Sequence, residues 1–179
     1  MARKAKAAKE SLTTMTEMVL PNDTNTLGNL MGGRLMYFMD IAAAIAAQKH
    51  SNRIVVTASV DNVSFRHPIK LGNVVTIKAQ VTRAFNSSME VHLEVWAEDI
   101  PAQTKHKTNE AFYTFVAVDQ TGRPIDVPEV IPETEEEKRL YESAIHRREL
   151  RLILSGRMQI QDATELKELL SKNLYPTAE

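Results

Sequence analysis

A long apolar segment that contains one carboxylate constrains this chain more than any other feature. Residues 31–47 read MGGRLMYFMDIAAAIAA and, at 3.6 residues per turn, leave almost no polar face. Such a helix is expected to be buried on all sides. Because an unpaired buried charge is unfavourable, Asp40 must be neutralised, hydrogen-bonded or kept for chemistry. The fold therefore has to place this helix at its centre and account for the acid.

Two glycines open this segment. Gly32 and Gly33 stand at the expected start of the helix, where backbone N–H groups without partners and the positive end of the helix dipole can face a carbonyl oxygen or an anion. The missing Cβ allows a close approach. Such N–H groups and a carboxylate about two turns further along one helix suit acyl transfer. The alternative is a Gly-Gly helix start with Asp40 satisfied by a neighbouring donor.

A polar, turn-forming loop, Pro21 to Asn29, leads directly into the glycines. Loop and helix together meet every fixed position of the pattern L-P-x-D-x-N-x-x-G-x-x-x-G-G-x-x-M-x-x-M-D. In this the chain resembles the hotdog-fold acyl-CoA thioesterases of the cytosolic acyl-CoA hydrolase type. The resemblance covers about residues 15 to 128 and continues through Val56–Asp61, Phe65, Pro68–Ile69, Leu71–Val75, Val91–Trp96 and Thr114–Asp119.

The resemblance implies hydrolysis of an acyl-CoA thioester to free carboxylic acid and CoA. It assigns Asp40 as the catalytic carboxylate and Asn25 as its polar partner, with the two residues contributed by different subunits. The N–H of Gly32 or Gly33 would bind the developing oxyanion. Asp40 would act as a general base on water or attack the carbonyl to form a mixed anhydride, and the sequence leaves both routes open. CoA is part of the substrate, and no cofactor is expected.

Downstream of the helix, alternating apolar and polar residues predict strands. A first strand is expected near Ser11, and the clearest ones are residues 54–65, 74–83, 89–98 and 110–118. Their pattern is typical of an antiparallel sheet with one buried face, which can curl around the helix. The predicted fold class is therefore α+β, with a curved antiparallel sheet wrapped around a long central helix. The resemblance names this the hotdog fold and implies a homodimer with a continuous sheet, assembled further as a trimer of dimers into a hexamer.

Changes in composition suggest three segments: a disordered basic tail over residues 1–10, the hotdog domain over 11–128 and a helical extension over 129–179. In the extension, Thr134 and Glu137 have the spacing of a capping box, and Asp162–Asn173 is a second candidate helix. The extension is expected to pack on the sheet or on a neighbouring subunit. Its basic cluster, His146–Arg151, offers an alternative role in binding the CoA phosphates.

Candidate CoA contacts elsewhere lie in two turns. Ser87 and Ser88 offer hydroxyls and backbone amides, although serines in a hairpin are ordinarily turn residues. Candidate phosphate contacts are Arg83 and the turn at Gly122 and Arg123.

Composition excludes several function classes. A net charge of −1 argues against electrostatic binding to nucleic acid or to a membrane surface. No segment approaches the roughly 20 apolar residues of a membrane helix, and a cytoplasmic location is expected. The chain has no cysteine, so a disulfide, a zinc–thiolate site and a cysteine nucleophile are impossible. The five histidines lack metal-ligand spacing, and no metal site is predicted.

Two other functions remain as alternatives. A non-catalytic acyl-CoA sensor would use the same fold and pocket without turnover, but it would not need both Asn25 and Asp40. A hotdog hydratase or dehydratase acting on hydroxyacyl thioesters would be expected to set a histidine beside the acid. The loop from Asn22 to Gly33 has no histidine, so both alternatives are disfavoured.

Overall fold

The computed structural model describes residues 5–61, 63–65 and 67–174. The chain divides into two compact units, Met1–Ile131 and Pro132–Glu179. The first unit contains the sheet and the long helix, and the second contains the C-terminal helices. No helix within the described ranges combines the length and the apolar character needed to cross a membrane.

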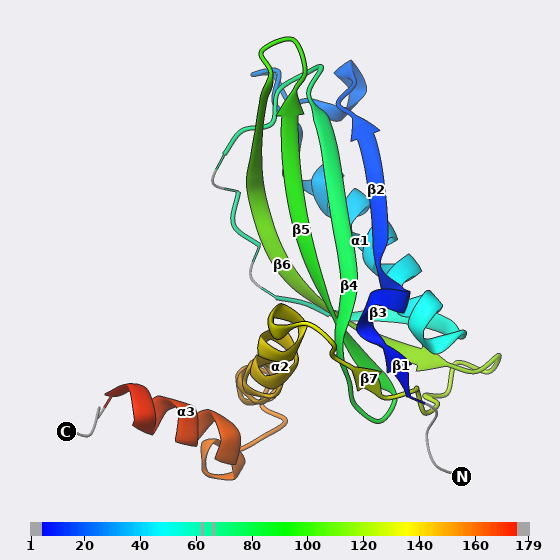
Figure 1. The fold of residues 1–179 in the computed structure, drawn as a ribbon, viewed down its shortest axis with the longest axis vertical. Helices are drawn as coiled ribbons and strands as arrows, with labels where there is room; N and C mark the ends of the chain where they lie inside the picture. Colours follow the sequence, from blue (N-terminus) through cyan, green and yellow to red (C-terminus); the bar gives the residue numbers. More distant parts are fainter. Residues whose placement is uncertain (1–4, 62, 66, 175–179) are drawn as a thin grey trace. The chain divides into compact units, whose positions relative to one another are not determined.

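One five-stranded antiparallel sheet dominates the first unit (Figure 1). Its strands lie in the order β2 (Thr13–Met18), β4 (Val74–Ala84), β5 (Ser88–Asp99), β6 (Thr104–Val118) and β3 (Ile54–Val60). The alternation seen in the sequence is confirmed on β5, because Val91, Leu93 and Val95 are fully buried. The sheet is curved and carries one long helix, which confirms the α+β class and the hotdog arrangement.

Two predicted strand boundaries are wrong. β3 ends at Val60 instead of Phe65, after a bulge between Thr57 and Ser59. β6 begins at Thr104, six residues before the predicted start at Glu110. Residues 104–109 are polar and pair with the end of β5, and residues 104–106 are exposed, so the strand there shows no apolar alternation.

Helix α1 (Gly32–Ser51) lies across one face of the sheet and contacts all five strands. Small side chains let the helix approach closely: Ala42, Ala43, Ala46 and Ala47 are fully buried. The expectation of burial on all sides is wrong for the single chain, because Tyr37 is 53% exposed and Ile45 39% exposed. The reason is geometric, since a sheet that curls over a helix covers only one side of it.

The N-terminal segment differs from the predicted disordered tail. β1 (Lys6–Ala7) pairs in parallel with β7 (Val130–Ile131), and a 3-10 helix (Ala8–Ser11) follows. The buried Ser11 hydroxyl accepts a hydrogen bond from the Val81 N–H at 2.8 Å, which ties this segment to the sheet. The pairing of β1 with β7 and the Ser11–Val81 hydrogen bond fix the position of this segment, although the segment has no apolar stretch. The first unit consequently extends past the predicted boundary at residue 128, and residues 1–4 of the predicted tail lie outside the described residues.

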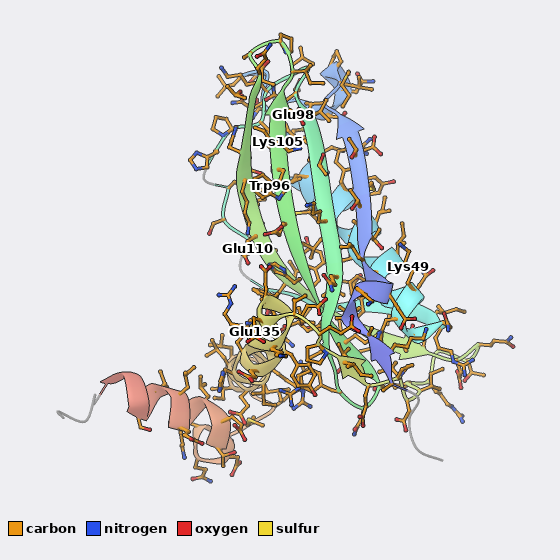
Figure 2. All side chains as sticks on the ribbon, in the orientation of Figure 1. Lys49, Trp96, Glu98, Lys105, Glu110 and Glu135 are labelled. Carbon is orange, nitrogen blue, oxygen red and sulfur yellow. The ribbon has the colours of Figure 1, made fainter. Side chains whose placement is uncertain are left out.

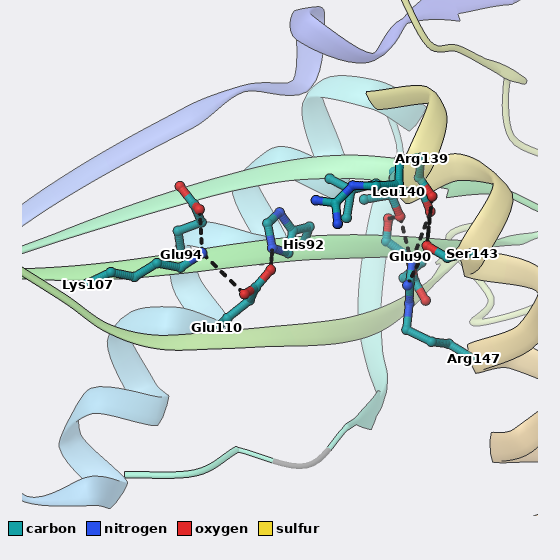
Figure 3. Close-up of polar contacts among 10 residues, drawn as sticks. Glu90, His92, Glu94, Lys107, Glu110, Arg139, Leu140, Ser143 and Arg147 are labelled. Carbon is teal, nitrogen blue, oxygen red and sulfur yellow. Dashed lines mark hydrogen bonds and ion pairs between the residues drawn. The ribbon is translucent and has the colours of Figure 1, made fainter. Parts of the chain in front are cut away.

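The second unit consists of α2 (Glu135–Leu154), a 3-10 helix (Ile160–Asp162) and α3 (Thr164–Leu174). The predicted capping box is confirmed: the Thr134 hydroxyl accepts from the Glu137 N–H at 3.1 Å, and the Glu137 carboxylate accepts from the Thr134 N–H at 3.0 Å. Glu149 joins the two helices, because its carboxylate accepts from the Leu166 N–H at 2.7 Å. Within α2, the Arg147 guanidinium donates to the Ser143 hydroxyl at 2.7 Å (Figure 3).

A second 3-10 helix (Pro21–Asp23) begins the loop that precedes α1. An isolated bridge from Thr24 to Leu30 closes this loop, and a second, from Asn29 to Lys70, holds it against the segment that leads into β4.

Candidate active site

Asp23 anchors the loop to the start of α1. Its carboxylate accepts hydrogen bonds from the Leu20 N–H at 3.1 Å and from the Arg34 guanidinium at 2.7 Å. These two bonds hold the pKa of the Asp23 carboxyl below its usual range. The backbone adds a third link, because the Met31 N–H donates to the Asp23 carbonyl oxygen at 2.9 Å. The loop therefore enters the helix along one defined path.

Asn25 lies at the tip of this loop, and its side chain closes the turn. Its Oδ1 accepts from the Leu27 N–H at 3.0 Å and from the Asn29 N–H at 3.2 Å. Gly28 adopts φ +71° there, in the left-handed region that favours glycine. The Asn25 Nδ2 donates no hydrogen bond to a described residue. Its two N–H groups are therefore available to an oxygen acceptor from a ligand or a partner chain.

The two glycines stand at the first turn of α1 as predicted. No described side chain caps the helix at Met31, so the first N–H groups keep the donor capacity expected of a helix N-terminus. The surroundings of the two glycines differ. A Cβ at Gly32 would lie 3.2 Å from the Phe65 ring, whereas a Cβ at Gly33 would meet no described atom within 4 Å.

A cavity of about 390 Å³ opens between the loop and the segment before β4. Its described lining residues are Asn25, Asn29, Leu30, Gly32, Leu35, Phe65, His67, Pro68, Ile69 and Asn109. Asn25 and Gly32 thus line one cavity, while Gly33 and Asp40 are not among its described lining residues.

Asp40 lies half-buried on α1, away from that cavity. Its carboxylate accepts a hydrogen bond from the Thr57 hydroxyl on β3 at 2.8 Å, and no other described residue bonds to it. Asp40 follows Gly32 by eight residues, which is about 12 Å along the axis at 1.5 Å per residue. The Gly32 N–H and the Asp40 carboxylate of one chain are therefore too far apart to contact the same carbonyl group.

The residues predicted to contact CoA gather at one end of the sheet. Ser87 lies in the turn from β4 to β5 and Ser88 is the first residue of β5, and the Ser87 carbonyl oxygen accepts from the Ala117 N–H at 2.8 Å. The turn at Gly122 and Arg123 follows β6 at the same end. The Arg83 guanidinium lies over the Phe85 ring at 5.6 Å. Because the cavity adjoins the opposite end of β4, these residues lie apart from it within one chain (Figure 1).

The other face of the sheet carries a charged cluster. Lys107 contacts Glu94 at 2.6 Å and Glu110 at 3.2 Å, and the His92 Nε2 is hydrogen-bonded to Glu110 at 2.6 Å (Figure 3). Burial opposes the charge on Glu110, but the bonds from His92 and Lys107 outweigh it and lower the pKa of that carboxyl. Lys105 and Glu98 extend the cluster along the hairpin at 3.2 Å (Figure 2). The Lys107–Glu94, His92–Glu110 and Lys105–Glu98 pairs each link β5 to β6.

No described group of three or more histidine and acidic side chains is arranged to hold a metal ion.

Sequence comparison assigns the chain to a known group. The model of the thioesterase superfamily matches residues 27–102. The chain is 42% identical over 139 residues to the uncharacterized acyl-CoA thioester hydrolase YkhA of Bacillus subtilis, a match that covers 78% of this chain and 81% of the relative. The chain belongs to the hotdog-fold acyl-CoA thioesterase family. The chain is also 42% identical over 139 residues to the mouse acyl-coenzyme A thioesterase 11. That match covers 78% of this chain but only 23% of the mouse protein, which is longer.

Solved structures of the family share this fold. An apo-hexameric acyl-CoA thioesterase matches with a TM-score of 0.83 and 41% identity, over 87% of this chain and 99% of that one. An acyl-CoA hydrolase from Staphylococcus aureus, solved with butyryl coenzyme A, coenzyme A and coenzyme A disulfide, matches with a TM-score of 0.78 and 39% identity. That match covers 86% of this chain and 95% of the hydrolase.

Two residues, one beside Asp40 and one in the cavity wall, were not predicted as site residues from the sequence. Thr57 holds Asp40, and the signal for it was a hydroxyl on the strand face turned toward the helix. His67 lines the cavity and contacts His106 edge-to-face at 5.9 Å, a proximity that chain spacing does not reveal. The hydrogen bond that Asp40 makes within the described residues comes from Thr57 and not from His67.

Proposed function

We propose that this protein hydrolyses acyl-CoA thioesters to a carboxylic acid and CoA, with Asp40 as the catalytic carboxylate. The observation that carries the proposal is the Thr57–Asp40 hydrogen bond, which orients a carboxylate that stands in the apolar stretch of α1. An acid held on one side by a hydroxyl keeps its second oxygen for a reacting water or carbonyl carbon. The names of the relatives support the substrate class.

The spacing of three residues supports the assignment. The Staphylococcus aureus hydrolase has been solved as three variants in which an asparagine, an aspartate or a threonine is replaced by alanine. In that chain the three positions follow one another at intervals of 15 and 17 residues. Asn25, Asp40 and Thr57 follow one another at the same intervals. The three residues replaced in the Staphylococcus aureus hydrolase thus correspond in spacing to Asn25 at the loop tip, Asp40 on the helix and Thr57 on the facing strand.

The catalytic site is completed by a second subunit. Because Gly32 and Asp40 are about 12 Å apart along the helix, one thioester carbonyl cannot contact both in a single chain. We assign the carbonyl oxygen to the Asn25 amide and the Gly32 N–H of one subunit, and the carbonyl carbon to Asp40 of the other. Donors fixed before the reaction stabilise the developing oxyanion without reorganisation.

Exposed apolar side chains support this dimer. β3 is an edge strand, and its Ile54, Val56 and Val60 are 58%, 48% and 39% exposed. Tyr37 and Ile45 are exposed on the neighbouring helix. Edge strands offer unpaired backbone groups to another strand, and burial of apolar surface contributes about 25 cal/mol per Å². We assign this surface to pairing with a second copy, and the hexameric relatives support a trimer of such dimers.

The reaction follows from these roles. In the general-base route, Asp40 takes a proton from water while the water oxygen bonds to the thioester carbon. The tetrahedral intermediate collapses, the C–S bond breaks, and the CoA sulfur receives the proton. In the other route, the Asp40 carboxylate attacks the thioester carbon, the C–S bond breaks, and CoA leaves as a thiolate with formation of a mixed anhydride. Water then hydrolyses the anhydride to the free acid and the Asp40 carboxylate, and the proton that it releases passes to the CoA sulfur. In neither route does the reaction draw on a cofactor, because CoA is part of the substrate.

Three further assignments are proposed with this function. Arg83, Ser87, Ser88, Gly122 and Arg123 contact CoA from the far end of the sheet. The segments of the chain act as a hotdog domain and a helical extension. The cytosolic hydrolase of the rat, 37% identical over 134 residues, supports a cytoplasmic location.

Replacement of Asp40 tests the proposal. Asp40→Asn is nearly isosteric and should lower kcat on acyl-CoA by about 10² to 10⁴, the usual contribution of a general base. The assay measures CoA thiol release across acyl chain lengths. The protein itself adds no thiol background, because it contains no cysteine.

A matched variant controls for the change from acid to amide. Glu17→Gln alters an exposed acid on β2 and should retain parental kcat and melting temperature. Turnover of Asp40→Asn within a few-fold of the parent would contradict the catalytic assignment. Absence of thiol release by the parent on every acyl-CoA would contradict the proposed function.

A further inference from the structure

Tyr113 carries a buried hydroxyl without a role in the fold. The residue lies on β6 and is 1% exposed, and its hydroxyl has no hydrogen-bond partner among the described residues. Buried polar groups are nearly always paired, since an unsatisfied one loses its hydration without compensation. The Tyr113 hydroxyl therefore keeps its hydrogen-bonding capacity for a partner that is not a described residue, and its place in the sheet decides what that partner is.

The sheet register places Tyr113 on the same side as the catalytic carboxylate. Thr57 pairs with Phe115 across β3 and β6, and the Thr57 hydroxyl reaches Asp40 on α1. Directly paired residues share a face of the sheet, and so do residues two apart on one strand. Tyr113 is two residues from Phe115 and therefore faces α1 about 7 Å further along the strand.

The bulge in β3 lies at this point. The register shifts between Thr57 and Ser59, and Val60 is then the partner of Tyr113. Bulges re-aim side chains next to functional sites. Here the bulge lies between the residue that holds Asp40 and the residue that pairs with Tyr113.

We propose that Tyr113 is a positioning residue whose hydroxyl, together with Asp40, holds the water that attacks the thioester. This inference rests on the proposed hydrolysis and on its general-base route. The water oxygen bonds to the thioester carbon, one water proton passes to the Asp40 carboxylate, and the water's other O–H is held by the Tyr113 oxygen. When the C–S bond breaks, its electron pair stays with sulfur, which takes the proton from Asp40.

Tyr113 keeps its own proton throughout. Burial, together with the nearby charge of Asp40, raises the pKa of the Tyr113 hydroxyl to about 12. The hydroxyl therefore orients the water without competing with Asp40 for its proton.

The test compares Tyr113→Phe with the parent on an acyl-CoA that the parent hydrolyses. Because a misplaced reactant loses on the order of a hundredfold in rate, kcat should fall roughly ten- to a hundredfold while KM stays unchanged. The melting temperature should stay the same or rise, since the variant removes a buried hydroxyl that lacks a partner. A purely structural tyrosine would not separate kcat from KM in this way.

Thr114→Val is the matched control. Thr114 is the next residue on β6, and its buried hydroxyl also lacks a partner among the described residues. Neighbouring residues on a strand point to opposite faces, so this hydroxyl faces away from α1. Thr114→Val should keep parental kcat.

Two outcomes would overturn the inference: a kcat of Tyr113→Phe within twofold of the parent, or an equal fall of kcat in Thr114→Val. If Asp40→Asn loses turnover while Tyr113→Phe keeps it, the proposed function stands and the role of Tyr113 fails. If Asp40→Asn also keeps turnover, the catalytic assignment itself fails.

Discussion

At the residue scale, Asp40 illustrates how this fold keeps a charge on an apolar helix. The carboxylate is half-buried and receives one hydrogen bond, from Thr57. A single neutral donor does not compensate a fully buried charge, so the position suits an acid that remains partly exposed in the single chain. The catalytic role of this acid stays a prediction, since a hydrogen bond from a neighbouring hydroxyl is expected of a structural acid as well.

The two glycines at the start of α1 lead to the next prediction. Gly32→Ala should lower kcat by up to about 10² to 10³, because its Cβ meets Phe65 at 3.2 Å and displaces the donor that we assign to the oxyanion. Gly33→Ala should retain more activity, because a Cβ there meets no described atom within 4 Å. Measurements of kcat and melting temperature on both variants check this.

Gly33→Ala also serves as the control for helix propensity, since alanine favours a helix over glycine by up to about 1 kcal/mol. Its melting temperature should match or exceed that of the parent. The reverse order of kcat, with Gly33→Ala the more damaged variant, would move the oxyanion donor to Gly33, which the sequence analysis left open. Normal hydrolysis by both variants would remove the helix N-terminus from the mechanism.

At the scale of elements, the C-terminal end of α1 depends on a buried histidine. His50 is 0% exposed, and its Nε2 donates to the Pro128 carbonyl oxygen at 2.9 Å. The Nδ1 has no partner among the described residues. Burial lowers the pKa of His50 below 6.5, and the bond to Pro128 opposes this only in part. The helix end is therefore packed around a neutral imidazole.

This pKa shift predicts acid sensitivity. Below pH 6.5 the unfolded chain binds a proton that the folded His50 resists. The stability linked to His50 is thus present above pH 6.5 and is lost as the pH falls from there through the lower folded-state pKa. Thermal unfolding between pH 8 and pH 5 should show a declining melting temperature.

His50→Gln retains a donor for Pro128 without titrating, and it should flatten the decline. His146→Gln, a half-buried histidine on α2, provides the matched control and should keep the parental slope. An unchanged slope in His50→Gln would show that other groups cause the acid sensitivity.

At the scale of the whole molecule, the donors of the cavity and the acid of the helix belong to different places on one chain. Asn25 lines the cavity, Asp40 bonds to β3, and no hydrogen bond joins them among the described residues. In a dimer with two-fold symmetry, each chain would therefore contribute Asn25 to one active site and Asp40 to the other.

Mixed dimers test this arrangement. Asn25→Ala and Asp40→Ala should each be inactive alone, but a hybrid dimer carries one intact site. Full random exchange of subunits should restore about a quarter of the parental activity, because half of the dimers are hybrids with one of two sites intact. Subunit exchange is verified by native mass spectrometry of size-tagged chains. If activity is not restored although subunit exchange is verified, Asn25 and Asp40 of the same chain must serve one active site.

Local features of this protein could be predicted from its sequence. The apolar run predicted α1, the alternation on β5 predicted the buried strand face, and Thr134 with Glu137 predicted the cap of α2. These features depend on residues within a few positions of one another, so a short segment of the sequence is enough to predict each of them. The pattern from Leu20 to Asp40 is local in the same sense, which is why it singled out Asn25, Gly32 and Asp40.

Contacts between residues far apart in the sequence decided the other features of the fold and of the candidate site. The β3–β6 register set Thr57 beside Asp40 and turned Tyr113 toward α1, and the fold brought His67 to the cavity wall. Partners of this kind are separated by many residues, and spacing along the chain says nothing of their distance in space. The exposed side of α1 has the same cause, since composition predicts an apolar helix but only the position of the sheet decides which side is covered.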